Sequence, residues 1–530
     1  MAPVFNLLWV LSLLPANVAV AQTAPIADVG YAKYRGTQNT TLGVNTFFAL
    51  KFAEAPVGAL RWKAPKPIED SKNFTTGILD ATTAGPSCVQ GYPYWILPNP
   101  GRPAGSEDCL HLNVVTPSNA TSTSKLPVLV NIHGGGYTLG DGNSIQPYAL
   151  VRHSNNSIIV VNIQYRLGSY GFMGSKKFSR AGGATNLGLL DQRLAIEWVQ
   201  KHISTFGGDP KKVTIMGGSA GGGSVTSQMI LYGGVRKPPF RAAIAEYPWW
   251  QQFLRDQQLE KQYNNLLSAA NCTNMSCLRE MSEDALALAT QATYAKGYAD
   301  EAYGYGNFYY GPSVDGYVIQ DLPNEEFKAG HYTKVPLLID RDQYEGFVFT
   351  NQSITTTAEE TRDMRVQFQY ADDTFMQQLY NLYPASAFNS TVWQRQTWFG
   401  DFIINCPTYF VASALTLTGQ KVWKLIFNAG SQEHGATGPY LFDINYNSSP
   451  SANVTLANIM KDWFISFIIH TDPNTQSWSG VQKPSWLQYQ AEANIMDVNY
   501  TQVGVLSDRY FDKSERCDFF SENGAIIQNR

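Results

Sequence analysis

Ser219 lies in a glycine-rich segment that suits a nucleophile. The residues Gly217-Gly218-Ser219-Ala220-Gly221 join a short apolar run, KVTIM, to a stretch that we expect to be helical. A sharp strand-to-helix turn forces an unusual backbone conformation, and glycines around the serine avoid side-chain clashes where strand and helix pack closely. The serine hydroxyl then lies at the helix N-terminus, where the helix dipole stabilises developing negative charge. The pattern Gly-x-Ser-x-Gly therefore predicts Ser219 as the nucleophile of an acyl-transfer reaction.

A second glycine run, His133-Gly134-Gly135-Gly136, follows the apolar segment 126–130. Consecutive N–H groups without side chains can point at one small site, and acyl transfer needs such donors for the oxyanion of its tetrahedral intermediate. We expect Gly135 and Gly136, together with Ala220, to form this oxyanion hole. The alternatives are a simple glycine turn or a phosphate-binding loop, and the latter lacks the lysine of the P-loop pattern here.

A nucleophilic serine needs a general base, and three histidines follow Ser219 in the chain. In enzymes with this type of turn the order is serine, acid, histidine, each after a strand. His331 precedes the apolar segment 335–340 and leaves no suitable acid before it. His470 ends the apolar segment 463–469 and is better explained as a helix-end residue. His434 lies in a loop directly after the apolar segment 421–427, and we predict it as the base.

The acid that orients the base should follow the apolar segment 335–340. Asp340, Asp342 and Glu345 all suit this role by position. The pattern of residues alone does not choose among them.

These groups need a sheet that brings their loops to one edge. Six apolar segments are predicted as buried strands: 126–133, 157–165, 212–218, 242–248, 335–340 and 421–427. The segment 186–208 has apolar residues at helical spacing and ends at two glycines. Apolar strands that alternate with helices predict an α/β fold, with a mostly parallel central sheet flanked by helices and with insertions in its loops.

The ends and the charge of the chain limit the classes of function. Residues 1–21 predict a signal peptide with an Ala19-Val20-Ala21 cleavage site, and residues 22–530 a single domain. About eleven Asn-x-Ser/Thr sequons fit a secreted glycoprotein. No later segment is long and apolar enough to predict a membrane span. With 39 Lys and Arg against 43 Asp and Glu and no basic run, we expect no nucleic-acid partner.

Longer segments resemble the type-B carboxylesterase/lipase family, the cholinesterase-like branch of the α/β-hydrolase fold. The segments SEDCLHLNV (106–114) and FGGDPKKVTIMGGSAGG (206–222) are similar to its two signatures. The similarity covers nearly the whole chain after residue 21, and secreted fungal esterases and lipases look most similar. The resemblance implies Glu345, which precedes Gly346, as the acid and His434 as the base. It also implies Gly135, Gly136 and Ala220 as the oxyanion donors.

Six cysteines in a secreted protein suggest three disulfides, although six cysteines allow fifteen pairings. Cys272 and Cys277 are close enough in sequence to pair locally. Cys88 with Cys109 would close a loop rich in proline and aromatic residues, and Cys406 with Cys517 would tie the C-terminal region to the body. The placement of cysteines in the family supports these pairings.

The chain also departs from the family. The family usually has Glu directly before the nucleophile, where this chain has Gly218. Trp95 is not at the position of the choline-binding tryptophan, ten residues before Cys109, where Asn99 stands. We therefore do not expect choline esters as substrates.

These observations predict a secreted serine carboxylesterase that acts on apolar esters without a metal or cofactor. Two aromatic segments, 246–253 with Trp249 and Trp250, and 302–316, could line its apolar pocket or simply pack in the core. A triacylglycerol or sterol-ester lipase is an alternative, with the loop between Cys88 and Cys109 as a lid or as a stapled surface loop. Two further alternatives are a peptidase that uses the same triad and a non-catalytic adhesion or binding protein with the same fold. The sequence does not predict the oligomeric state.

Overall fold

The computed structural model describes residues 24–71, 77–145, 147–235, 237–448 and 452–529. The predicted signal peptide, residues 1–21, lies outside these ranges.

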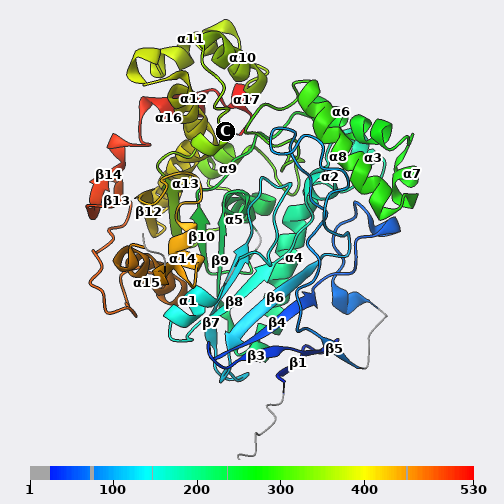
Figure 1. The fold of residues 1–530 in the computed structure, drawn as a ribbon, viewed down its shortest axis with the longest axis vertical. Helices are drawn as coiled ribbons and strands as arrows, with labels where there is room; N and C mark the ends of the chain where they lie inside the picture. The colour runs from blue at the N-terminus through cyan, green and yellow to red at the C-terminus, as the bar shows by residue number, and fades with distance from the viewer. Residues whose placement is uncertain (1–23, 72–76, 146, 236, 449–451, 530) are drawn as a thin grey trace, which may run out of the picture.

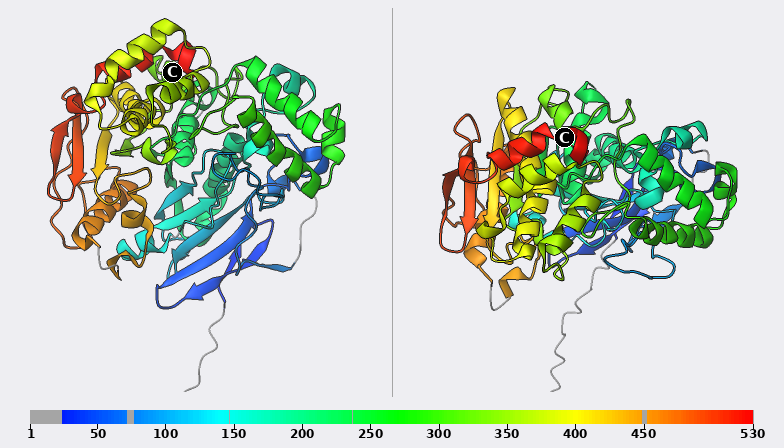
Figure 2. Two further views of the ribbon diagram at one scale, coloured as in Figure 1. Left: turned by 45° about the horizontal axis from the view of Figure 1, so that its top comes forward. Right: turned by 90° about the horizontal axis from the view of Figure 1, so that it is seen from above.

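A large twisted sheet forms the centre of the molecule, with the N-terminal strands in blue at one end and β13 and β14 in red and orange at the other (Figures 1 and 2). In the described part of the chain it has eleven strands in the order β14-β13-β12-β11-β10-β9-β7-β8-β6-β4-β3. In chain order these are β3 (Thr37–Asn39), β4 (Val44–Lys51), β6 (His111–Pro117), β7 (Leu126–Ile132), β8 (Ile159–Ile163), β9 (Gly208–Gly218), β10 (Ala242–Glu246), β11 (Leu337–Asp342), β12 (Val422–Asn428), β13 (Asn494–Asn499) and β14 (Val503–Ser507). A small separate sheet pairs β1 (Ile26–Asp28), β2 (Lys33–Arg35) and β5 (Ile78–Asp80).

Along the sheet, the neighbouring strands from β8 through β7, β9, β10, β11 and β12 to β13 pair in parallel. The remaining pairs, at the two ends of the sheet, are antiparallel. The parallel strands are almost entirely buried, which requires helices on both faces. This arrangement confirms the predicted α/β fold with a mostly parallel sheet. It also brings the carboxyl ends of β7, β9, β10, β11 and β12 to one edge.

Helices cover the two faces over two separate apolar clusters. The larger cluster includes α4, α5 and α13, and the smaller one includes α1, α14 and α15, which lie at the lower left of Figure 1. The helices between β6 and β10 are α1 (Tyr148–His153), α2 (Gly168–Phe172), α3 (Lys176–Arg180), α4 (Leu187–His202) and α5 (Ala220–Ile230). Those after β12 are α14 (Gly438–Phe442), α15 (Val454–His470), α16 (Glu515–Glu522) and α17 (Gly524–Ile527).

Two long helical insertions follow the strands β10 and β11. The first contains α6 (Asp256–Ala269), α7 (Met275–Glu280), α8 (Glu283–Ala299) and α9 (Pro323–Lys328). The second contains α10 (Thr357–Gln367), α11 (Asp373–Leu382), α12 (Thr391–Gly400) and α13 (Cys406–Leu417). Figure 1 shows α6 to α8 on one side of the top of the molecule and α10 to α12 on the other. The C-terminal helix α17 lies between them.

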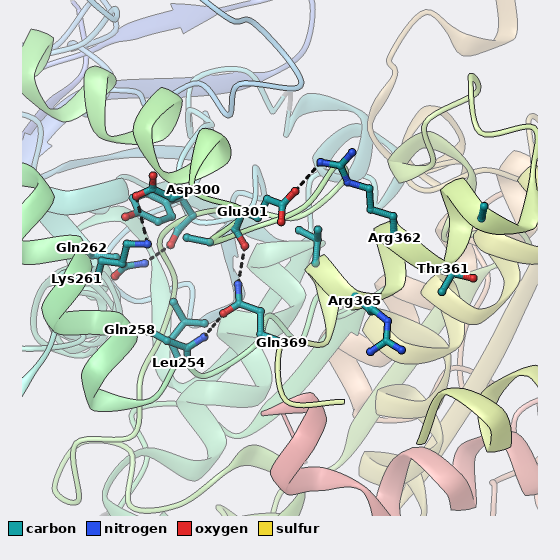
Figure 3. A pocket seen from close by; sticks show the side chains of 14 residues that line it. Leu254, Gln258, Lys261, Gln262, Asp300, Glu301, Thr361, Arg362, Arg365 and Gln369 are labelled. Atoms are coloured by element: carbon teal, nitrogen blue, oxygen red, sulfur yellow. Dashed lines mark hydrogen bonds and ion pairs between the residues drawn. The ribbon is translucent and has the colours of Figure 1, made fainter. Parts of the chain in front are cut away.

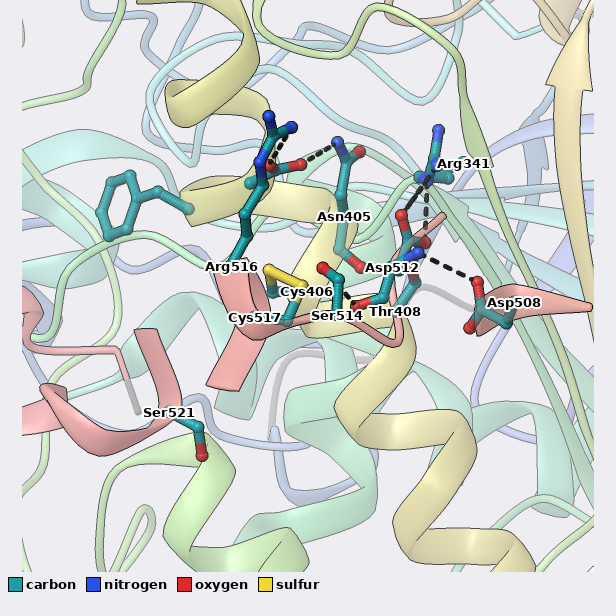
Figure 4. Close-up of a disulfide and its surroundings, with 12 residues drawn as sticks. Arg341, Asn405, Cys406, Thr408, Asp508, Asp512, Ser514, Arg516, Cys517 and Ser521 are labelled. Atoms are coloured by element: carbon teal, nitrogen blue, oxygen red, sulfur yellow. Dashed lines mark hydrogen bonds and ion pairs between the residues drawn. A yellow bond between two sulfur atoms is a disulfide. The ribbon is translucent and has the colours of Figure 1, made fainter. Parts of the chain in front are cut away.

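The structure contains three disulfides, Cys88–Cys109, Cys272–Cys277 and Cys406–Cys517. The last joins α13 to α16 next to a buried ionic network (Figure 4). Arg341 on β11 pairs with Asp512 at 2.7 Å, and Lys424 on β12 pairs with Asp508 at 2.7 Å and with Asp512 at 2.5 Å. Two cations and two carboxylates thus compensate one another, and they tie the C-terminal segment to the sheet.

Candidate active site

Ser219 occupies a sharp turn between β9 and α5. Its backbone has φ 60° and ψ −126°, a conformation that side chains other than glycine rarely adopt. A Cβ at Gly221 would lie 2.1 Å from the Ile132 carbonyl oxygen, so only glycine allows this approach of helix and sheet. The Ser219 N–H donates to the Glu246 carbonyl at 3.2 Å, and its own carbonyl accepts from the Trp249 N–H at 3.0 Å. The turn is therefore held on both sides of the serine by β10 and the segment after it.

The glycine run after β7 lies directly beside this turn. A Cβ built on Gly134 would be 3.0 Å from the Ser219 Cβ. Gly135 and Gly136 have φ values of 107° and 59°, which glycine adopts readily. Within the described residues, the N–H groups of Gly135, Gly136 and Ala220 donate no hydrogen bond. Three free donors therefore lie in the two segments that meet at the serine.

His133 opens this glycine run but is not placed as a base. Its ring stacks on Tyr165 with centroids 4.4 Å apart, and its Nδ1 lies 2.9 Å from the Gly134 carbonyl. Complete burial lowers the pKa of His133 to about 4. We conclude that this histidine is neutral and supports the loop.

His434 and Glu345 form a short hydrogen bond. The Nδ1 of His434 lies 2.5 Å from the Glu345 Oε2, and Glu345 is completely buried. The other oxygen, Oε1, accepts the Asp342 N–H at 2.5 Å. Of the three acids that suit the position after β11, only Glu345 hydrogen-bonds the imidazole; Asp340 accepts from the Tyr247 N–H instead. Among the described residues, no hydrogen bond joins Ser219 to His434, a contact that often forms only once substrate is bound.

The other two histidines that follow Ser219 have different surroundings. His331 is exposed and lies 3.6 Å from Glu326. His470 is exposed as well, and its Nε2 lies 3.0 Å from the Gln476 side chain. Among the described residues, no hydrogen bond or ion pair joins either histidine to Ser219 or Glu345.

Aromatic rings surround the imidazole of His434. The rings of Tyr247 and Phe349 each lie with centroids 4.9 Å from it, and Trp249 lies at 6.4 Å. Phe308 contacts Trp249 at 5.3 Å, and a Cβ on Gly136 would lie 2.3 Å from its ring. Tyr247 and Phe308 lie in the two aromatic segments that the sequence offered as candidates for the pocket, 246–253 and 302–316. Phe349 was not among the candidates, and its position just after Glu345 is the signal that could have found it.

The two tryptophans proposed for the pocket have different positions. Trp249 is completely buried among Phe308, Phe349 and His434, and its indole N–H has no partner among the described residues. Trp250 packs in the core behind α5, where its Nε1 donates to Thr226 at 3.0 Å and its ring stacks on Phe327. The structure therefore brings Trp249, and not Trp250, against the imidazole.

The loop between Cys88 and Cys109 reaches the same aromatic cluster. Trp95 donates from Nε1 to the Asn307 carbonyl at 2.7 Å. Its ring lies 5.8 Å from Phe308 and 6.3 Å from Phe349. The next residues, Ile96 and Leu97, are 42% and 43% exposed. The loop therefore packs on the wall of the site with one tryptophan and presents two aliphatic side chains to solvent.

Three further carboxyl groups are buried behind the histidine loop. Burial raises the pKa of Glu246 to about 8. Burial and repulsion from neighbouring carboxylates raise the pKa values of Asp340 and Asp342 well above their usual range. Within the described part of the chain, none of the three forms an ion pair with Lys or Arg. In this part of the chain, no Lys or Arg therefore stabilises the charged form of Glu246, Asp340 or Asp342.

A separate cavity of about 630 Å³ lies between α6 and α10 (Figure 3). Its charged residues compensate one another: Arg362 pairs with Glu301 at 2.8 Å, and Lys261 with Asp300 at 3.2 Å. None of Ser219, His434 and Glu345 lines it. Within the described residues, no group of His, Cys, Asp and Glu is arranged to hold a metal ion.

A model of the carboxylesterase family matches residues 23–520. The chain belongs to this family. It is 30% identical to carboxylesterase patB of Aspergillus clavatus, over 88% of this chain and 91% of that protein. It is also 30% identical to secreted lipase 1 of Botryotinia fuckeliana, over 99% of this chain and 98% of that protein. The crystal structure of Aspergillus niger EstA superposes with a TM-score of 0.83 at 27% identity and covers 96% of this chain and 99% of its own.

Membership in the carboxylesterase family makes this protein a carboxylic ester hydrolase and confirms the predicted enzyme class. The α/β-hydrolase fold is confirmed as well, by a structural neighbour that is itself an esterase. Across the described residues, no helix combines the length and the apolar character needed to cross a membrane.

Proposed function

We propose that the protein is a secreted serine esterase of apolar esters that acts through Ser219, His434 and Glu345. The observation that carries this proposal is the 2.5 Å hydrogen bond between His434 and the buried Glu345 beside the turn of Ser219. A carboxylate on Nδ1 fixes the tautomer whose Nε2 can take the proton of the serine. The non-catalytic alternative is disfavoured because all three residues of the triad are present.

The reaction follows two acyl-transfer steps. The Ser219 Oγ attacks the ester carbonyl while His434 takes its proton, and Glu345 stabilises the imidazolium that forms. The N–H groups of Gly135, Gly136 and Ala220 stabilise the oxyanion, and loss of one such donor typically costs about 3 kcal/mol of activation free energy. The alcohol leaves with the proton from His434, and water then releases the acid by the same route. Hydrolysis should fall at acidic pH, since the base must be neutral.

The aromatic wall supports apolar esters as the substrates. Trp249, Phe308 and Phe349 pack next to His434 and Gly136 and make this side of the site apolar. Lipase activity is the second candidate, because several relatives are named lipases and because Ile96 and Leu97 are exposed beside the site. Secretion is supported by the predicted signal peptide and by the relatives named secreted lipases. N-terminal sequencing of the mature protein should then begin at Gln22.

Labelling with a fluorophosphonate probe tests the nucleophile. The wild type should be labelled at Ser219 and Ser219→Ala should not, while Ser224→Ala on the same helix should be labelled like the wild type. Equal labelling of Ser219→Ala would remove Ser219 as the nucleophile. A series of p-nitrophenyl esters of increasing chain length, compared with emulsified triglyceride, separates an esterase from a lipase.

A further inference from the structure

One buried residue, Asp342, contacts both loops of the proposed triad. It is the last residue of β11 and is completely buried. Its N–H donates to the Glu345 Oε1 at 2.5 Å. Its side-chain Oδ2 accepts the N–H groups of Gly435 at 2.7 Å and Ala436 at 3.1 Å, directly after His434. The acid and the base are therefore joined through the same residue.

The turn after His434 depends on this side chain. Gly435 has φ 87°, and in the described residues its N–H donates only to Asp342. The Ala436 N–H also lies 2.9 Å from the Glu433 carbonyl, so its bond to Asp342 is shared. One backbone bond, from the Tyr344 N–H to the Gln432 carbonyl at 2.8 Å, joins the two loops ahead of the histidine. Beyond the histidine, the Asp342 carboxyl holds Gly435, and the Thr437 hydroxyl, which donates to Glu246 at 3.2 Å, ties the next residues to β10.

The surroundings of Asp342 favour an uncharged carboxyl group. Burial raises the pKa of Asp342, and repulsion from Glu345 and Glu246 raises it further. The N–H groups of Gly435 and Ala436 act in the opposite direction, but the pKa stays well above its usual range. Its second oxygen, Oδ1, has no partner among the described residues. A neutral acid is compatible with these contacts, because its carbonyl oxygen at Oδ2 can accept both N–H groups while Oδ1 carries the proton.

We propose that Asp342 is a positioning residue for His434, and that it works as a neutral hydrogen-bond acceptor which fixes the turn at Gly435 and Ala436. The proposal rests on the proposed triad. The side-chain amide of asparagine has the same shape as the neutral acid and keeps the accepting oxygen. Asparagine should therefore replace Asp342 in this role, and alanine should not.

Kinetics with a p-nitrophenyl ester test this role in the full-length enzyme. Asp342→Asn should retain kcat within about threefold of the wild type, whereas Asp342→Ala should lose on the order of 10- to 100-fold, as expected when a reacting group is displaced. KM should stay within about threefold in both, since the aromatic wall is untouched. The rate of fluorophosphonate labelling should follow kcat.

Asp462 provides a matched control. It is completely buried and accepts the backbone N–H groups of Trp478 and Ser479, but it lies on α15 away from the triad. Asp462→Ala should lower the thermal midpoint and leave kcat unchanged.

Two results would overturn the proposal: Asp342→Ala with the kcat of the wild type, or a folded Asp342→Asn with a loss as large as that of Asp342→Ala. If Asp342→Ala does not fold, Asp342→Asn decides alone, and a loss beyond about tenfold in kcat rejects the neutral acceptor. The variant Ser219→Ala distinguishes a failure of the proposed triad from a failure of the proposed role of Asp342. An active Ser219→Ala removes the triad itself, whereas an inactive one together with a fully active Asp342→Ala removes only the role of Asp342.

Discussion

At the scale of single residues, the position before the nucleophile is coupled to a tyrosine on the next strand. The family resemblance places Glu before the serine, but a Cβ on Gly218 would lie 2.5 Å from the Tyr247 Oη and 2.6 Å from two of its ring carbons. The same ring packs edge-on against His434. Glycine at 218 and tyrosine at 247 are therefore one complementary pair, and the phenol fills the space that a side chain at 218 would need.

A double-mutant cycle tests this pair. Gly218→Ala should lower kcat by on the order of tenfold or more, because the ring must shift and the imidazole with it. In a Tyr247→Ala background the same change should lower kcat by less than about threefold, which gives a coupling of about 0.7 kcal/mol or more. Tyr247→Phe keeps the ring carbons and should not relieve the clash. Equal losses in both backgrounds would show that the two positions are independent.

The sequence identified the residues of the proposed triad more readily than the residues around them. The chain order and the place of each loop after a strand led to Ser219 and His434 as candidates. Asp340 and Asp342 lie at the end of β11 and Glu345 just after it, so position alone left three candidates. The family resemblance favoured Glu345, and Glu345 is the one of the three that hydrogen-bonds the imidazole. The segment that contains Tyr247 was a candidate for the pocket, but its contact with His434 was not predicted, because it joins loops far apart in the sequence and has no local pattern.

At the scale of elements, the apolar segments located the parallel strands within a few residues of their observed bounds. The strands toward the two ends of the sheet, β3, β4, β6, β13 and β14, were not among the predicted ones. β4 and β14 are only partly buried, so their sequences carry a weaker apolar signal. β6 is fully buried, yet its sequence, HLNVVTP, mixes polar residues with apolar ones.

The loop between Cys88 and Cys109 makes a prediction about specificity. Trp95→Ala removes the ring that packs against Phe308 and Phe349. These two side chains can then move apart, and the site beside Gly136 should accommodate larger acyl groups. The ratio of kcat/KM for p-nitrophenyl laurate over acetate should rise by on the order of tenfold, in the range that a few apolar contacts control. Trp478→Ala, which alters the other apolar cluster, should leave the ratio unchanged. An unchanged ratio in Trp95→Ala would separate the loop from substrate selection.

At the scale of the whole molecule, the three disulfides close loops of very different length. The paired cysteines are 5, 21 and 111 residues apart. Chain entropy predicts that replacing a pair by serine lowers the free energy of unfolding by about 2 kcal/mol for Cys272–Cys277, about 3 for Cys88–Cys109 and about 5 for Cys406–Cys517. Urea unfolding of the three double variants measures this order. A larger loss for Cys272–Cys277 than for Cys406–Cys517 would reject chain entropy as the main source.

The buried carboxyl groups give the molecule a dependence of stability on pH. Burial raises the pKa of Glu246 from 4.5 to about 8 in the folded state. Below pH 4.5 Glu246 is protonated in both the folded and the unfolded protein, and its contribution to stability is at its maximum. Between pH 4.5 and about 8 the unfolded chain has released the proton that the folded chain keeps, so stability should fall as pH rises, by up to about 1.4 kcal/mol per unit for this group.

Replacing Glu246 by Gln should reduce this loss, since the amide keeps an acceptor for the Thr437 hydroxyl and does not titrate. Urea unfolding at pH 5 and pH 8 should give a smaller difference for Glu246→Gln than for the wild type. A difference should remain, because Asp340 and Asp342 are shifted in the same direction. The exposed Glu492→Gln should behave like the wild type. If Glu246→Gln loses as much stability as the wild type over this range, Glu246 does not hold its proton in the folded protein, and the cluster must contain a charge that some other group compensates.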